Sequence, residues 1–136
     1  MYPDELVDPM RKELTDVGVK ELRDEQSVDE AMSKEGTLLV IVNTVCGCAA
    51  SSLRPAIPIA LKHSKLPTQI TTVFAGKDLE ATSKARSYFE GYEPSSPSVY
   101  LLKDKKVLFA LERHQIQGRD FEEVAEDLVS AFDKHC

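Results

Sequence analysis

The pattern of apolar and polar positions along the chain predicts helices that alternate with strands. Short apolar runs rich in β-branched residues, from Leu38 to Val42 and from Ile70 to Ala75, are typical of strands buried on both faces. Apolar residues also recur every three or four positions, from Leu6 to Val17 and from Phe121 to Phe132. Such stripes predict amphipathic helices that pack one face against a sheet. We expect the run from Leu38 to Val42 to form the central strand.

Local start and stop signals give bounds for the first two helices. Asp8 is suited to cap a helix and Pro9 to occupy its first position, and Gly18 then ends that helix. The segment Ser27–Glu30 has the form of a capping box, which predicts the start of a second helix. Gly36 is expected to close it, directly before the central strand.

Further signals divide the second half of the chain. Pro55 and Pro58 must kink or split the helix that follows the central strand, because each lacks an N–H group. Asp78 is placed to cap a later helix, and the segment Asp120–Glu123 has the form of another capping box. The other expected elements are a short strand at Val19 to Leu22, a helix up to about Phe89, and strands at Val99 to Leu102 and Val107 to Leu111 joined by a turn at Asp104-Lys105. If the last strand lies at the edge of the sheet, the charges of Glu112 and Arg113 after it are expected to discourage pairing with another strand.

The predicted element order is α-β-α-β-α-β-α-β-β-α. Strands joined by helical crossovers are parallel where they are neighbours, and only the last two can form an antiparallel hairpin. We therefore expect an α/β fold of three layers, with a mixed central sheet between helices. If residues 1–18 are set aside as an N-terminal helical extension, the order resembles the thioredoxin fold. We expect residues 1–136 to form one such domain.

Composition and charge narrow the possible functions. The chain has 136 residues and a net charge of −6, which argues against nucleic acid or an anionic membrane as a main partner. The N-terminus lacks the apolar segment of a signal peptide, and no apolar run has the length of a membrane span. Three cysteines are too few for a disulfide-stapled secreted scaffold. We therefore expect a cytoplasmic protein.

Two cysteines separated by one glycine follow the predicted central strand. Cys46 and Cys48 lie where a strand turns into a helix, and N–H groups at a helix start stabilise a thiolate. Gly47 is suited to absorb the distortion of a small disulfide ring, and such a strained disulfide favours exchange or isomerisation over a strongly reducing role. We predict Cys46 as the nucleophile and Cys48 as a resolving or passive thiol. Asn43 and Thr44 are expected to support the turn through local hydrogen bonds.

A second feature of the predicted site is Ser96-Pro97, just before the strand at Val99 to Leu102. In the thioredoxin fold, a cis-proline in this position packs beside the redox cysteines. Tertiary packing can select the cis form because it costs only about 0.5–1 kcal/mol over trans. The resemblance to that fold therefore implies that Ser96 and Pro97 contact substrate.

Several segments together resemble the bacilliredoxin family over nearly the whole chain. They are Asn43-Thr-Val-Cys-Gly-Cys-Ala-Ala, Val73-Phe-Ala-Gly, Ala81-Thr-Ser-Lys-Ala-Arg, Glu93-Pro-Ser-Ser-Pro-Ser and Ala131-Phe-Asp-Lys-His-Cys136. The resemblance implies a cytoplasmic thiol–disulfide oxidoreductase that removes bacillithiol from mixed disulfides on oxidised client proteins, with weak disulfide isomerase activity in some members. Cys46 would attack the mixed disulfide, and Cys48 or another thiol would release the bacillithiol. No cofactor beyond this thiol co-substrate, and no metal, is implied.

Two other functions fit the cysteine pair. Two thiolates together with His63, His114 or Cys136 have the ligand types of a zinc site. Alternatively, a buried Cys46 with a raised pKa would make the chain a redox-inactive interaction module. The sequence leaves open the client proteins, the small thiol that is used, the oligomeric state and whether Cys48 resolves the intermediate.

Three further residues near these motifs have plain interpretations. Cys136 ends the chain and is either a third redox thiol or a tail cysteine without a role. Arg54 is expected to form a surface salt bridge rather than to act on the thiols, and His63 is expected to be solvated.

Overall fold

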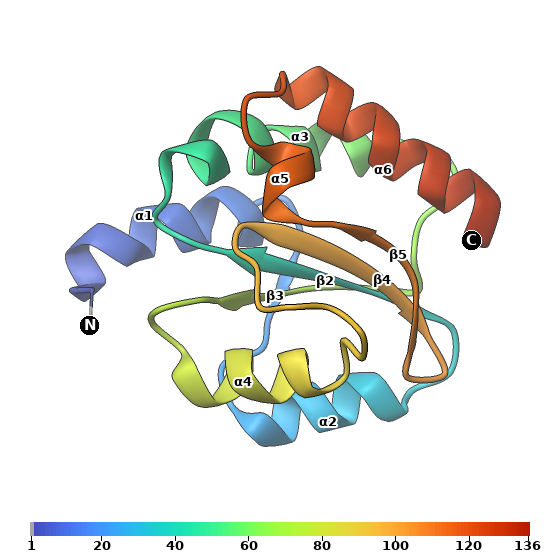
Figure 1. Ribbon diagram of the computed structural model, residues 1–136, viewed down its shortest axis with the longest axis horizontal. Helices are drawn as coiled ribbons and strands as arrows, with labels where there is room; N and C mark the ends of the chain where they lie inside the picture. The colour runs from blue at the N-terminus through green and yellow to red at the C-terminus, as the bar shows by residue number, and fades with distance from the viewer. Residues whose placement is uncertain (1) are drawn as a thin grey trace.

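The computed structural model describes residues 2–136 as five strands and seven helical segments (Figure 1). The strands are β1 (Lys20–Glu21), β2 (Thr37–Asn43), β3 (Gln69–Phe74), β4 (Ser98–Lys103) and β5 (Lys106–Leu111). The helices are α1 (Asp4–Thr15), α2 (Glu25–Ser33), the π-helical turn η1 (Ala49–Leu53), α3 (Ala56–Ala60), α4 (Leu79–Ser87), α5 (Arg113–Ile116) and α6 (Phe121–His135). None of these helices has both the length and the apolar character to cross a membrane.

The strands form one mixed sheet in the order β1-β3-β2-β4-β5, so β2 is the central strand as predicted. β2 pairs in parallel with β3, which in turn pairs in parallel with β1. On its other side, β2 pairs antiparallel with β4, and β4 forms the C-terminal hairpin with β5. The predicted mixed sheet with a C-terminal antiparallel hairpin is therefore confirmed.

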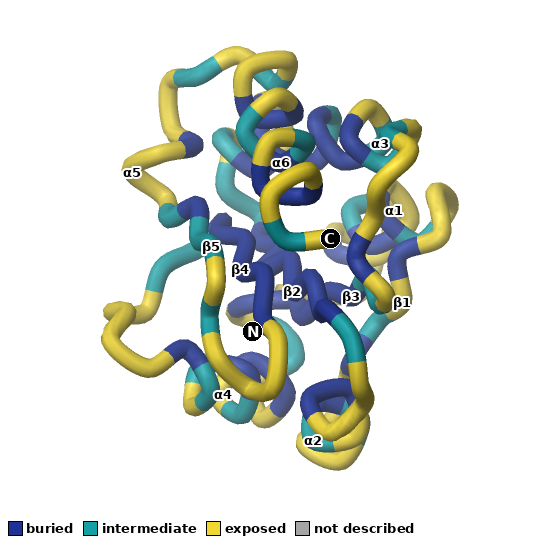
Figure 2. The backbone as a smooth tube through the Cα atoms, turned by 90° about the vertical axis from the view of Figure 1, so that its right-hand side faces the viewer, coloured by how far each residue is buried: buried dark blue, intermediate teal, exposed yellow. Residues whose placement is uncertain are grey.

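Two apolar cores lie on opposite faces of the sheet, and every residue of β2 is buried. Alternate β2 side chains enter the two cores, Leu39 and Ile41 on one face and Val40 and Val42 on the other. The first core is completed by residues of α1, α3 and α6, and the second by residues of α2 and α4. Figures 1 and 2 show the resulting three layers, with the buried strands between the two sets of helices.

The first helix begins earlier than the sequence predicts. Asp8 does not cap it, because α1 already begins at Asp4 and passes through Pro9. The Pro3 carbonyl accepts hydrogen bonds from the N–H groups of Leu6 and Val7, which builds an additional turn ahead of the proline. The fully buried Val7 side chain anchors that turn in the core. Tertiary burial therefore outweighs the local start signal.

Other helix ends also differ from the predictions. The capping box of α2 pairs Asp24 with Ser27, rather than Ser27 with Glu30, and α2 ends at Ser33, before Gly36. Asp120 precedes α6, but its side chain makes no capping hydrogen bond. The short helix α5 was not predicted, since a single turn leaves no periodic pattern in the sequence.

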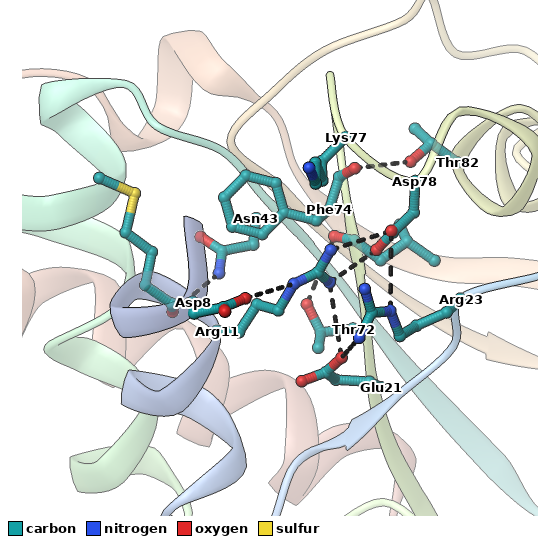
Figure 3. A network of polar contacts seen from close by, with 12 residues as sticks. Asp8, Arg11, Glu21, Arg23, Asn43, Thr72, Phe74, Lys77, Asp78 and Thr82 are labelled. Atoms are coloured by element: carbon teal, nitrogen blue, oxygen red, sulfur yellow. Dashed lines mark hydrogen bonds and ion pairs between the residues drawn. The ribbon is translucent and has the colours of Figure 1, made fainter. Parts of the chain in front are cut away.

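Asp78 precedes α4 but does not cap it, because its carboxylate binds Arg11 of α1 instead. The two side chains form a bidentate pair with N–O distances of 2.7 and 2.9 Å, and both are largely buried. Glu21 of β1 accepts a further bond from Arg11, and Arg23 lies beside both carboxylates (Figure 3). This charge network holds α1 against β1 and the start of α4.

The Arg11–Asp78 pair yields a testable prediction. Replacing Arg11 with alanine leaves the Asp78 carboxylate largely buried without its partner, so we expect a loss of about 3–5 kcal/mol in the free energy of unfolding. Urea denaturation measures this loss, and an Arg11→Ala/Asp78→Ala double variant should lose less than the sum of the two single variants. Strict additivity would contradict the pairing.

Candidate active site

The C-terminal ends of β2 and β5 and the start of β4 bring the predicted site residues to the same end of the sheet. Val42 of β2 lies opposite Ser98 of β4, so Asn43 and the cysteine turn extend toward the Ser96-Pro97 segment. On the other side of β4, Val99 lies opposite Leu111, the last residue of β5. The segment after β5 therefore begins at the same end of the sheet as the two cysteines.

Cys46 and Cys48 are free thiols, both half-buried, whose Sγ atoms lie 2.8 Å apart. The Cys46 carbonyl accepts hydrogen bonds from the N–H groups of Ala49 and Ala50, so the turn leads directly into η1. As the sequence predicts, Pro55 interrupts helical structure, which resumes as α3 at Ala56, whereas Pro58 lies inside α3 and does not split it. The two sulfur atoms thus face each other at the exposed Gly47, and little movement is needed to form a bond between them.

The surroundings of the two thiols push their pKa values in opposite directions. The Cys48 thiol bonds to the Cys46 sulfur, and this bond contributes most to lowering the pKa of Cys46, with further help from backbone N–H groups and the charge of Arg113. Burial and the adjacent Cys46 sulfur raise the pKa of Cys48. Cys46 is therefore the thiol that ionises first, and its thiolate is the stronger candidate for nucleophilic attack.

The Asn43 side chain connects the cysteine turn to neighbouring elements. Its side chain is buried, and its Oδ1 atom accepts a hydrogen bond of 2.9 Å from the Thr44 N–H group. Its Nδ2 atom donates to the Met10 carbonyl of α1 at 3.2 Å. Figure 3 shows Asn43 between α1 and the end of β3. Asn43 therefore makes the predicted local hydrogen bond to the turn, and it also joins the turn to the N-terminal helix α1.

Arg54 corrects an expectation from the sequence, because it is buried rather than at the surface. Only 2% of it is exposed, and its Nη1 atom donates to Asn43 Oδ1 at 3.0 Å and to the Thr44 carbonyl at 2.8 Å. Its Nε atom binds Glu13 of α1 at 3.1 Å. Arg54 therefore joins the segment before Cys46 to the helical segment after Cys48. We call Asn43, Thr44 and Arg54 the turn clamp.

The Ser96-Pro97 peptide bond is cis, and Pro97 is buried while Ser96 is half-buried. The Ser98 hydroxyl donates to the Ser95 carbonyl at 2.7 Å, which fixes the loop ahead of β4. The Ser96 carbonyl accepts a bond of 3.3 Å from Arg113. The cis-proline that the resemblance implies is thus present before β4, and Arg113 contacts the residue ahead of it.

The sequence of the chain matches known proteins over nearly its whole length. A sequence model described as disulphide isomerase matches residues 2–136. The chain is 52% identical over 137 residues to a bacilliredoxin from Bacillus licheniformis, with 99% of this chain and 95% of the relative covered. It is 48% identical over 136 residues to a bacilliredoxin from Staphylococcus epidermidis, with 100% and 94% covered.

The chain belongs to the bacilliredoxin family.

Solved structures agree at the level of the fold. A thioredoxin from Malassezia sympodialis superposes with a TM-score of 0.58 at 13% identity, covering 87% of this chain and 90% of that one. A mutant thioredoxin from Halobacterium salinarum gives a TM-score of 0.56 at 15% identity, covering 85% and 91%. The predicted thioredoxin-like fold is therefore confirmed, and membership of the family makes this chain a thiol redox protein.

In this bacilliredoxin-family chain, Cys136 lies far from the other two cysteines. Its Sγ atom is 3.7 Å from the Thr37 hydroxyl at the start of β2, whereas Cys46 follows the end of that strand. A strand of 7 residues spans about 20 Å at roughly 3.3 Å per residue. Figure 1 shows the C-terminus at the opposite end of β2 from the cysteine turn. Within one molecule, Cys136 therefore cannot resolve a disulfide formed at Cys46.

The ligands of the alternative zinc site are not brought together. His63 lies at the surface as expected, and its Nε2 atom is 2.7 Å from the Asp133 carboxylate. His114 lies 3.9 Å from Glu112. Within residues 2–136, the structure has no cluster of three or more His, Cys, Asp or Glu side chains that is suited to a metal ion.

Arg113 is the residue at this site that the sequence did not reveal. It follows the edge strand β5, where its charge fits the role of discouraging strand pairing. The structure shows that its charge acts on both thiols and that it contacts the Ser96 carbonyl. Only the pairing of β4 with β5 places it there, and no local sequence signal reports that contact.

The hydrogen bond between the thiols predicts how the pKa of Cys46 depends on Cys48. Removing the donor by Cys48→Ala destabilises the Cys46 thiolate, so the pKa of Cys46 rises and its reaction midpoint moves to higher pH. Thiolate ultraviolet absorbance measures the titration in a Cys136→Ala background. Cys48→Ser retains a hydroxyl donor and should shift the midpoint less. An unchanged or lower midpoint in Cys48→Ala would contradict this account.

The turn clamp predicts unequal effects of two substitutions on one ion pair. Arg54→Ala leaves Asn43 Oδ1 and the Thr44 carbonyl without their charged donor and should cost about 1.5–3 kcal/mol of unfolding free energy. Glu13→Ala removes only a half-exposed carboxylate and should cost less than about 1 kcal/mol. Urea denaturation under reducing conditions compares them. Equal losses of unfolding free energy would show that the Arg54–Glu13 ion pair, rather than the hydrogen bonds of the turn clamp, stabilises the fold here.

Proposed function

We propose that this protein reduces mixed disulfides between client proteins and a low-molecular-weight thiol, bacillithiol, through attack by Cys46. The observation that carries the proposal is the pair of facing thiols after β2, with the pKa of Cys46 lowered and that of Cys48 raised. The bacilliredoxin names of relatives that match the full chain support the choice of bacillithiol. The clients are proteins oxidised on cysteine, in the cytoplasm.

The proposed reaction has two thiol–disulfide exchanges. The Cys46 thiolate attacks the bacillithiol sulfur of the mixed disulfide, forms a Cys46–bacillithiol disulfide and expels the client cysteine as a thiolate. The Cys48 thiol, once deprotonated, attacks the Cys46 sulfur, closes the Cys46–Cys48 disulfide and expels bacillithiol. Two molecules of a low-molecular-weight thiol then return the pair to its reduced form and leave as their own disulfide.

Ser96 and Pro97 are proposed to receive the client backbone beside Cys46. The half-buried Ser96 precedes β4 at the same end of the sheet as the cysteine turn. A client segment laid along this loop would present its disulfide to the Cys46 sulfur.

Disulfide isomerisation is a second candidate, favoured by the description of the matching family as disulphide isomerase. The same attack by Cys46 on a client disulfide yields a covalent intermediate, and another client cysteine then displaces Cys46. Because no net oxidation occurs, this reaction requires a nucleophile but no resolving thiol. Cys48 would contribute to isomerisation chiefly through its hydrogen bond to Cys46.

Single-cysteine variants test the assignment of roles. A client carrying one bacillithiolated cysteine is mixed with wild type, Cys46→Ala, Cys48→Ala or Cys136→Ala, and the released client thiol and all masses are followed. We expect Cys46→Ala to release none, Cys136→Ala to match wild type, and Cys48→Ala to release client while accumulating bacillithiol on Cys46. Release by Cys46→Ala with none by Cys48→Ala would reverse the assignment.

A further inference from the structure

Arg113 differs from most arginines of the chain in having no acidic partner. Arg11, Arg23, Arg54 and Arg119 each form an ion pair with a carboxylate. Among residues 2–136, the structure pairs Arg113 with no carboxylate, although the chain carries a net charge of −6. Because no neighbouring carboxylate neutralises the Arg113 guanidinium, its positive charge is available to an anionic ligand.

The position of Arg113 is fixed from two sides, while its guanidinium group stays available. The Arg113 backbone N–H group donates to Ser95 Oγ at 2.8 Å, which anchors the start of α5 to the loop before Pro97. The side-chain bonds are longer, 3.3 Å from Nη1 to the Ser96 carbonyl and 3.5 Å from Nε to Gln117. In the described residues, Nη2 makes no hydrogen bond to the protein, so the exposed guanidinium retains donors in the fork arrangement that matches a carboxylate.

Arg113 also lies close enough to the reacting sulfurs to affect them. Its charge favours the thiolate form of both Cys46 and Cys48. The contact of 3.3 Å between Arg113 and the Ser96 carbonyl also places the guanidinium at the end of the sheet where a small thiol bonded to Cys46 would lie. A carboxylate on a client segment laid along Ser96 would lie near the same guanidinium, so the test has to separate these two sources of the carboxylate.

We propose that Arg113 is a specificity-determining residue that binds a carboxylate of the small thiol in the mixed disulfide. This inference rests on the proposed function and deepens it, because it states the chemical class of small thiol that the site prefers. Arg113 selects thiols that carry a carboxylate and disfavours those that carry an ammonium group. The client cysteine is released by the same exchange as before.

The test compares small thiols on one peptide. A neutral peptide with a single cysteine is blocked with mercaptosuccinate, 2-mercaptoethanol or cysteamine, and second-order rate constants for its release are measured. Wild type should prefer the mercaptosuccinate adduct over the 2-mercaptoethanol adduct by about threefold to tenfold, with cysteamine slowest. Arg113→Ala should abolish this preference, and Arg113→Lys should retain part of it. The ratio of two rates for one variant cancels any change in the ionisation of Cys46.

Two matched variants control for charge and for loop anchoring. Lys106→Ala removes one exposed positive charge at the far end of β5, and Arg86→Ala removes a contact of 3.5 Å to the Ser95 carbonyl. Both should retain the wild-type ratio. Equal ratios in wild type and Arg113→Ala would overturn the inference, as would loss of the ratio in Lys106→Ala.

A second peptide separates the two possible sources of the carboxylate. It carries aspartate beside its cysteine and is blocked with neutral 2-mercaptoethanol. The inference predicts that this aspartate gives no Arg113-dependent acceleration, and an acceleration equal to that of mercaptosuccinate would overturn the assignment to the small thiol. The same peptide blocked with bacillithiol is the positive control: if wild type does not release it, the proposed function itself fails, which is distinct from release of the adducts without a preference for the carboxylate.

Discussion

The turn that presents the two cysteines depends on one buried contact, between the Arg54 guanidinium and the end of β2. Arg54 donates to Asn43 Oδ1 and to the Thr44 carbonyl, and these two residues are the last of the strand and the first of the turn. A buried guanidinium is costly unless its donors are satisfied. The Asn43 and Thr44 oxygens that accept hydrogen bonds from Arg54 therefore have little freedom to move. These contacts fix the backbone just before Cys46.

The N-terminal helix belongs to the same arrangement. α1 supplies the Met10 carbonyl to Asn43 and the Glu13 carboxylate to Arg54, while its Arg11 binds Asp78 at the start of α4. Residues 1–18 were expected to be an extension to a thioredoxin-like fold. The contacts of α1 show that this helix supports the cysteine turn. A loss of α1 packing should therefore alter the position of the two thiols, because Asn43 would lose its bond to Met10.

How much the sequence predicted depends on the range of the physical signal. Apolar runs and stripes identified β2, β3 and the amphipathic helices, and Pro55 identified the break before α3, because these are local properties. Helix starts were less well predicted, since Asp78 binds Arg11 instead of capping α4, and burial of Val7 extends α1 ahead of Asp8. Arg54 and Arg113 were misjudged or missed because their roles arise from contacts across 10 or more positions. The cysteines themselves were evident because their chemistry needs no distant partner.

The central claim is that Cys46, held by the turn clamp and bonded by Cys48, is the most reactive thiol of the reduced protein. Competitive labelling with a limiting amount of iodoacetamide, followed by mass mapping of the three cysteines, tests it directly. At a pH below about 8.5, where an ordinary thiol is mostly protonated, the label should be found predominantly on Cys46. Predominant labelling of the exposed Cys136, or equal labelling of all three thiols, would contradict the account.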